Sequence, residues 1–289
     1  MAHIHGMAQT HGMAASFPDL AAAWSRALSG ERAPIEAALA QDSRLPGPRA
    51  NLELAARFAE TVAATPHDAR ASGMAVLTDW LATPPRVAGR LPAGTEEFLP
   101  SCAALAAGAV AARAAAGGDA LPGDALGLLT TAARDDRWRV RELASTGMQR
   151  VLAVDWPSGM SHVRVWLHSA EPLPMRAAVA AVAEPPLLRD AQHAADAVAV
   201  VREAVDALLA RPAAERTEEA RILRKALGYA ISVVAAADPA AGLPLLERLA
   251  ASADPDARWI ARENLGKARL KPFAERLAPV REAVGLAPA

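Results

Sequence analysis

The chain has little of several features that define common protein classes. Of its 289 residues only 4% are aromatic, and its single cysteine, Cys102, excludes an internal disulfide. A formal net charge of −1 argues against a protein built chiefly to coat nucleic acid. The longest apolar run, residues 103–112, is shorter than the roughly 18 residues of a membrane span, and the N-terminus lacks a secretory signal. We therefore expect a cytoplasmic protein with a buried, inert thiol and no membrane contact.

Catalytic signatures are also scarce. The sequence has no glycine-rich phosphate loop, no Ser-His-Asp set and no cysteine pair. His162, His168 and His193 share no metal-ligand spacing with a carboxylate or thiol. We expect no metal site and no small-molecule cofactor, and the expected partner is duplex DNA or a protein.

Apolar residues are abundant, at 52%, and many of them are alanine, which favours helices and lets helix axes approach closely. Because no run alternates with the period of a strand, the prediction is an all-α chain. Residues 1–15 read as a disordered tail, and residues 16–289 as one helical domain whose first helix is capped by Ser16. Helices are expected at about residues 16–30, 33–41, 49–64, 67–82, 95–116, 124–134, 136–153, 158–169, 174–183, 186–210, 217–236, 241–251, 255–268 and 272–284. Thr217 and Asp254 are expected to cap two of the later helices.

The chain also repeats itself. Arg-Trp-x-x-Arg-Glu occurs at residues 137–142 and again at 258–263. An apolar-arginine pair recurs with its arginines at Arg141, Arg176, Arg224 and Arg262, spaced 35, 48 and 38 residues apart. A period near 40 is typical of HEAT-type helix pairs, which stack into a superhelix with a concave inner surface. We therefore predict a right-handed α-solenoid of HEAT-like antiparallel helix pairs, clearest in residues 124–289, with an arginine ladder along its inner surface.

The repeat also has a purely structural interpretation. Asp135 or Asp136 could neutralise Arg141, and Asp254 or Asp256 could neutralise Arg262. The two repeat-equivalent tryptophans, Trp138 and Trp259, are predicted to lie in the core, because recurring apolar positions usually do.

Two stretches of the C-terminal half carry a family likeness. Arg224-Lys225-Ala226-Leu227-Gly228-Tyr229-Ala230 and Pro174-Met175-Arg176-Ala177-Ala178-Val179 resemble inner helices of bacterial HEAT-repeat proteins of the DNA-alkylation-repeat group, which includes alkylpurine DNA glycosylases. The resemblance implies a helix lining a DNA groove, with Trp156 and Tyr229 supplying aromatic faces. In the glycosylases an aspartate follows the first tryptophan. Here Asp155 precedes Trp156, which favours binding without strong catalysis.

Three functions remain open at this point. The first is duplex DNA binding in a concave basic groove, and its expected contacts are Arg141, Arg176, Arg224, Lys225, Arg262, Trp156 and Tyr229. The second is a protein–protein scaffold, which the near-neutral charge favours. The third is an alkylpurine DNA glycosylase, for which Asp155 is the candidate catalytic carboxylate.

Overall fold

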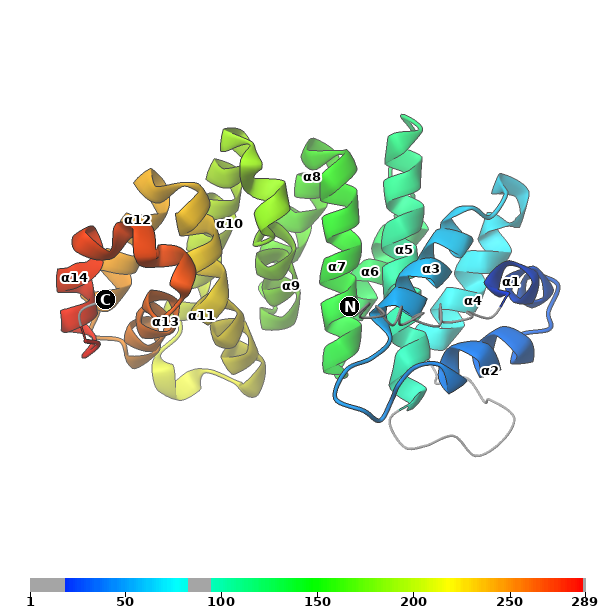
Figure 1. Ribbon diagram of the computed structural model, residues 1–289, viewed down its shortest axis with the longest axis horizontal. Coiled ribbons are helices and arrows are strands. Elements are labelled where there is room, and N and C mark those ends of the chain that lie inside the picture. The colour runs from blue at the N-terminus through cyan, green and yellow to red at the C-terminus, as the bar shows by residue number, and fades with distance from the viewer. Residues whose placement is uncertain (1–18, 83–94, 288–289) are drawn as a thin grey trace, which may run out of the picture.

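The chain folds into helices throughout the residues that the computed structural model describes, which are 19–82 and 95–287. Fourteen α-helices and no strand occur there, and the all-α prediction is confirmed. Figure 1 shows how the helices are arranged. The predicted tail and Ser16 lie outside the described residues; the N-cap of the first described helix is Asp19, which accepts from the Ala22 backbone N–H. The helices are α1 (Leu20–Leu28), α2 (Ala33–Gln41), α3 (Leu52–Ala63), α4 (Arg70–Ala82), α5 (Phe98–Ala116), α6 (Gly123–Ala133), α7 (Trp138–Val154), α8 (Trp156–Leu167), α9 (Pro172–Val182), α10 (Ala191–Leu209), α11 (Glu218–Ala237), α12 (Pro239–Ala250), α13 (Pro255–Leu265) and α14 (Ala274–Ala283).

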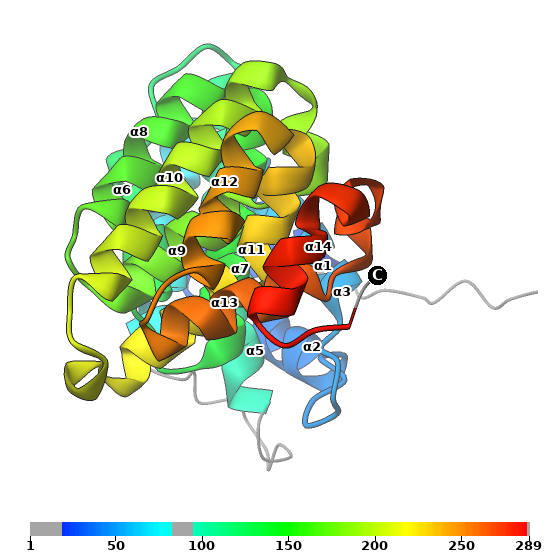
Figure 2. The ribbon, with the colours of Figure 1, turned by 90° about the vertical axis from the view of Figure 1, so that its left-hand side faces the viewer.

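Consecutive helices pack into two rows. Helices α3, α5, α7, α9, α11 and α13 contact one another in that order, and each later helix of this row also packs on the helix that follows it in the chain. Contacts between α4 and α6, and along α8, α10, α12 and α14, make the second row. Figure 2 shows α8, α10 and α12 together on one side of the molecule, and Figure 1 shows α1 to α4 at one end and α12 to α14 at the other.

Helix α5 is the most deeply buried element. Every residue from Phe98 to Ala111 is buried, in contacts with α3, α4, α6 and α7. Among the described residues it is the one helix with the length and hydropathy of a membrane span, and 83% of that window is buried inside the protein. Cys102 lies within it, and burial raises the pKa of its thiol. The thiol is thus kept protonated and inert, as predicted.

Small residues allow α5 and α7 to approach closely. A Cβ atom placed on Gly108 would lie 2.2 Å from the Cα atom of Gly147, so the two backbones meet where neither residue has a side chain. Ala104 also belongs to the α5 side of this contact, because its carbonyl oxygen would lie 3.1 Å from a Cβ atom placed on Gly147. The alanine-rich composition is therefore used to bring helix axes together.

Aspartate side chains cap the N-termini of several helices. Asp155, Asp190, Asp238 and Asp254 each accept a backbone N–H from the first turn of α8, α10, α12 and α13 respectively. A proline in the first turn follows in three of the four, where its fixed φ suits the helix and its missing N–H costs nothing. The predicted caps at Thr217 and Asp254 are confirmed.

Polar side chains join segments about one repeat apart in sequence. Trp166 Nε1 donates to Thr130 Oγ1 over 36 residues, and Asn264 Nδ2 donates to the Leu227 carbonyl over 37. Arg134 and Glu171, 37 residues apart, form a two-pronged ion pair. These separations are close to the sequence period of about 40 residues, and the first two links join α8 to α6 and α13 to α11.

Candidate binding surfaces

Most arginines of the predicted ladder bind other groups of the protein. Arg141 is buried, and its Nη1 donates to the backbone carbonyls of Asp135 and Asp136, at 2.8 Å for the latter. Burial, followed by the nearby charge of Arg176, lowers the pKa of the Arg141 guanidinium. The carboxylate of Asp135 pairs with Arg137 instead, at 2.6 Å. DNA contact through Arg141 stays a prediction, but its guanidinium already binds the turn before α7.

Arg176 and Arg224 are engaged with neighbouring helices. The Arg176 guanidinium pairs with Glu142 of α7 and lies 3.3 Å from Ser145 Oγ. The Arg224 guanidinium pairs with Asp256 of α13 and lies 4.4 Å from the centroid of the Trp259 ring. Its Nε is buried without a hydrogen-bond partner. Arg176 therefore joins α9 to α7, and Arg224 joins α11 to α13.

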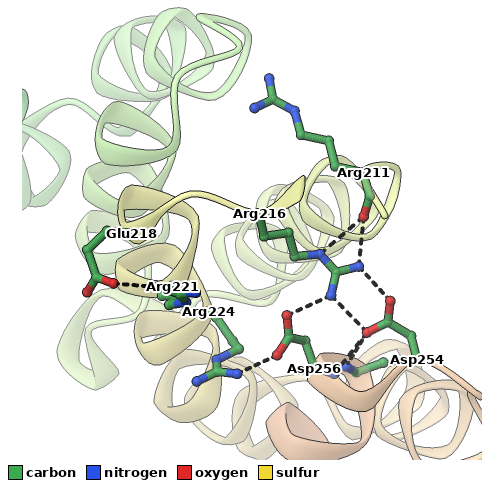
Figure 3. Close-up of polar contacts among 8 residues, drawn as sticks. Arg211, Arg216, Glu218, Arg221, Arg224, Asp254 and Asp256 are labelled. Carbon is green, nitrogen blue, oxygen red and sulfur yellow. Dashed lines mark hydrogen bonds and ion pairs between the residues drawn. The ribbon is translucent and has the colours of Figure 1, made fainter. Parts of the chain in front are cut away.

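A further arginine, absent from the ladder, is the most thoroughly bonded cation among the described residues (Figure 3). Arg216 lies in the turn before α11, with a side chain only 2% exposed. Its guanidinium donates to both oxygens of Asp254, to Asp256 Oδ2 at 2.6 Å and twice to the Arg211 carbonyl. All five N–H groups are thus satisfied.

The charges of this network stabilise one another. The hydrogen bonds to Asp254, ahead of the cost of burial, raise the pKa of Arg216 above its ordinary value. The Arg216 guanidinium in turn holds the pKa of Asp254 below its usual range. For Asp256, burial opposes ionisation, but the hydrogen bonds from Arg216 and then Arg224 outweigh it and leave the pKa lowered.

The expected pairing of Arg262 with these acids is wrong. Asp254 and Asp256 are bound by Arg216 and Arg224, which come from the preceding turn and helix. Arg262 is exposed, with no ion pair to any described residue. The periodic pattern of apolar-arginine pairs did not include Arg216, because Arg216 lies in a turn. Its separations of 38 and 40 residues from Asp254 and Asp256 are nevertheless close to the sequence period of about 40 residues.

Cations of α11, α13 and the segment after α13 make up what we call the C-terminal basic patch, which consists of Lys225, Tyr229, Arg262, Lys267 and Arg269. Lys225 and Tyr229 lie one turn apart on α11, Lys267 and Arg269 lie against the Tyr229 ring, and Arg262 lies on α13, which packs on α11. Tyr229 is 47% exposed; its hydroxyl accepts from Arg269 at 2.6 Å, and the Arg269 guanidinium lies 4.6 Å from the ring centroid. None of the four cations forms an ion pair with a described acid. Of the predicted DNA contacts, Lys225 and Tyr229 lie one turn apart on α11, and Arg262 lies on the neighbouring helix α13.

Asp155 and Trp156 lie elsewhere. Trp156, expected at the groove, is 6% exposed between α8 and α10, where its ring stacks on His193 at 4.0 Å and its Nε1 donates to Asp196 at 2.9 Å. Asp155 caps α8, and its hydrogen bonds with Ser158 lower the pKa of its carboxyl. Placement of Trp156 on an open binding surface is therefore wrong, because its ring packs into the helix interface.

The prediction that Trp138 belongs to the core is also wrong. Trp138 is the first residue of α7 and is 53% exposed, whereas Trp259 packs partly buried against Gly228 of α11. The Trp138 ring borders a cavity of about 510 Å³, which we call the Trp138 groove. Its lining comprises Arg44, Pro48, Arg49, Ala50, Leu52, Glu53, Phe98, Ser101, Trp138, Arg139, Glu142, Leu143 and Thr146.

The loop that forms one wall of the groove is held in place by hydrogen bonds. Asn51 donates its backbone N–H to the Ser43 carbonyl and its Nδ2 to the Asp42 carbonyl, each at 2.9 Å. Arg139 reaches across from α7 to the Gly47 carbonyl at 3.5 Å. Arg44 has a φ of 60°, which an L residue adopts at a cost that the surrounding contacts must offset. The loop therefore holds the Arg44 backbone in a conformation that an L residue does not favour by itself.

Three comparisons with known proteins gave no match. No protein-family model, no curated protein and no solved structure matches this chain.

Proposed function

We propose that the chain is a right-handed HEAT-like α-solenoid that acts as a protein-binding scaffold, with the Trp138 groove as its docking site. Two rows of consecutively packed helices, joined by polar links about one repeat apart, support the solenoid. Three of the four ladder arginines are bonded within the protein, which favours a scaffold over a continuous DNA groove.

The exposed tryptophan at the mouth of an apolar cavity carries this proposal. Soluble proteins bury most tryptophans, and Trp24, Trp80 and Trp166 of this chain are at most 3% exposed. Trp138 instead lies beside Leu52, which is 59% exposed, above a floor that includes Phe98 and Leu143. Exposed aromatic side chains that border a cavity are the usual anchors of protein interfaces.

Trp138→Ala is expected to weaken binding of the protein's peptide ligands at least about 30-fold, because loss of an anchor costs roughly 2 kcal/mol or more. Ligands would be selected from a displayed random peptide library on the full chain, and their affinities measured by fluorescence polarisation. Val165→Ala is the matched control, since Val165 is 58% exposed on α8, away from the groove. Selected peptides that bind both variants alike would refute the groove as the docking site.

A second candidate function is duplex DNA binding at the C-terminal basic patch. Two cations without ion-pair partners, Lys267 and Arg269, lie against the exposed ring of Tyr229, and Lys225 and Arg262 add two more on α11 and α13. Such charges contact phosphates by releasing counterions. Lys225→Glu combined with Arg262→Glu is expected to reduce the salt dependence of binding to a labelled duplex by about two units of log–log slope. Arg164→Glu, on an exposed site of α8, should leave the slope unchanged. Absence of binding at low salt would remove this candidate.

The glycosylase alternative is tested with the same duplex carrying an alkylated purine. Asp155→Asn keeps a side-chain oxygen that can cap α8, so the variant is expected to fold normally. Release of free base by the wild type, lost in this variant, would support Asp155 as the catalytic carboxylate. Release that persists in the variant would exclude it.

A further inference from the structure

Resting on the proposed function, we infer the chemistry of the partner: the Trp138 groove takes an acidic protein segment that carries one large apolar side chain. The apolar side chain would lie against Trp138 and Leu52, and flanking carboxylates would meet Arg44 and Arg49. The inference rests on which charges around the groove are already neutralised and which are not.

Most charged groups lining the groove are paired inside the protein. Arg139 donates to Glu97 at 2.7 Å, and its guanidinium lies 4.5 Å from the centroid of the Trp138 ring, so it covers part of that ring. Glu142 pairs with Arg176, and Glu53 pairs with Arg57 at 3.2 Å. These groups add little net charge that a ligand could meet.

Arg44 and Arg49 differ from the other lining residues. Both are exposed, and neither forms an ion pair or side-chain hydrogen bond with a described residue. Both lie on the hydrogen-bonded loop and line the groove, which therefore presents two unneutralised cations beside an apolar surface. Carboxylates on a ligand would complement them and would also speed association.

The segments outside the described ranges do not match this chemistry. Residues 1–18 contain no aspartate or glutamate, residues 83–94 contain two arginines and no acid, and residues 288–289 are proline and alanine. None of these segments supplies acidic side chains for Arg44 and Arg49. A separate acidic chain is therefore the better match to the groove.

The test is a peptide-library selection on the full-length protein, with the Trp138→Ala protein used to remove peptides that bind elsewhere. We expect the retained peptides to be net acidic and to share an aromatic residue or leucine. Fluorescence polarisation should then show at least about ten-fold weaker binding to the Arg44→Glu, Arg49→Glu double variant at low ionic strength. Arg49→Lys should bind like the wild type, and Arg164→Glu is the charge-reversal control on α8.

Different results would refute the acidic partner and the scaffold function. Retained peptides that need Trp138 but are neutral or basic, or that tolerate the double reversal, would overturn the acidic partner and leave the scaffold standing. No Trp138-dependent peptide would overturn both proposals. Trp138-dependent binding to vesicles with anionic lipid, or a Trp138-dependent dimer in sedimentation, would assign the groove to a membrane surface or a second copy and would also overturn the inference.

Discussion

Arg216→Ala is expected to lower the free energy of unfolding by about 3–5 kcal/mol, the usual cost of removing one partner from a buried ion pair. The side chain is 2% exposed, and its loss would leave Asp254 and Asp256 facing each other with only Arg224 to neutralise them. Figure 3 shows that the same guanidinium also holds the Arg211 carbonyl. Urea denaturation followed by far-UV circular dichroism measures the effect.

Arg221→Ala is the matched control. Arg221 is exposed on α11 and pairs with Glu218 on the same helix, so its loss should change stability by less than about 0.5 kcal/mol. Equal effects of the two substitutions would contradict the structural role of the Arg216 network.

The pH dependence of the difference between wild type and Arg216→Ala provides a second readout. In the folded protein the pKa values of Asp254 and Asp256 lie below their ordinary value of 3.8. The stabilisation is therefore fully present above pH 3.8 and is lost as pH falls through the folded-state pKa values. The wild-type advantage should be constant near neutral pH and shrink in acid.

Gly108→Ala is expected to destabilise the protein by about 3 kcal/mol, at the upper end of overpacking costs. The new methyl group would lie 2.2 Å from the Cα and 2.5 Å from the carbonyl carbon of Gly147. Because both are backbone atoms, no rotamer change relieves the clash, and α5 and α7 must move apart along a buried interface. Thermal and chemical denaturation of the purified variant measure the loss.

Gly127→Ala provides the contrast within the same fold. Gly127 lies in α6, is exposed, and would place its new methyl group more than 4 Å from any neighbour. Alanine is the better helix former by roughly 0.5–1 kcal/mol, so this variant should be slightly stabilised. If Gly108→Ala were as well tolerated, the close approach of α5 and α7 could not be as described.

The two copies of Arg-Trp-x-x-Arg-Glu show where prediction from the sequence reaches its limit. In the second copy Asp254 and Pro255 start α13 early, so Trp259 lies within the helix and packs on Gly228. The first copy has arginine, Arg134, where the second has Pro255, and α7 begins at Trp138 itself. The same motif thus occupies different positions along its helix, and one tryptophan is covered while the other is exposed.

What the sequence by itself determined is local: the helical class, the helix positions to within a few residues, the caps at Thr217 and Asp254, and the burial of Cys102. These follow from propensity, capping and apolar spacing, which act over one or two turns. The tertiary structure alone decided which arginines remain free. Arg216 and Arg224 reach Asp254 and Asp256 from about one repeat away and leave Arg262 unpaired, because partner choice depends on how neighbouring helices are aligned side by side.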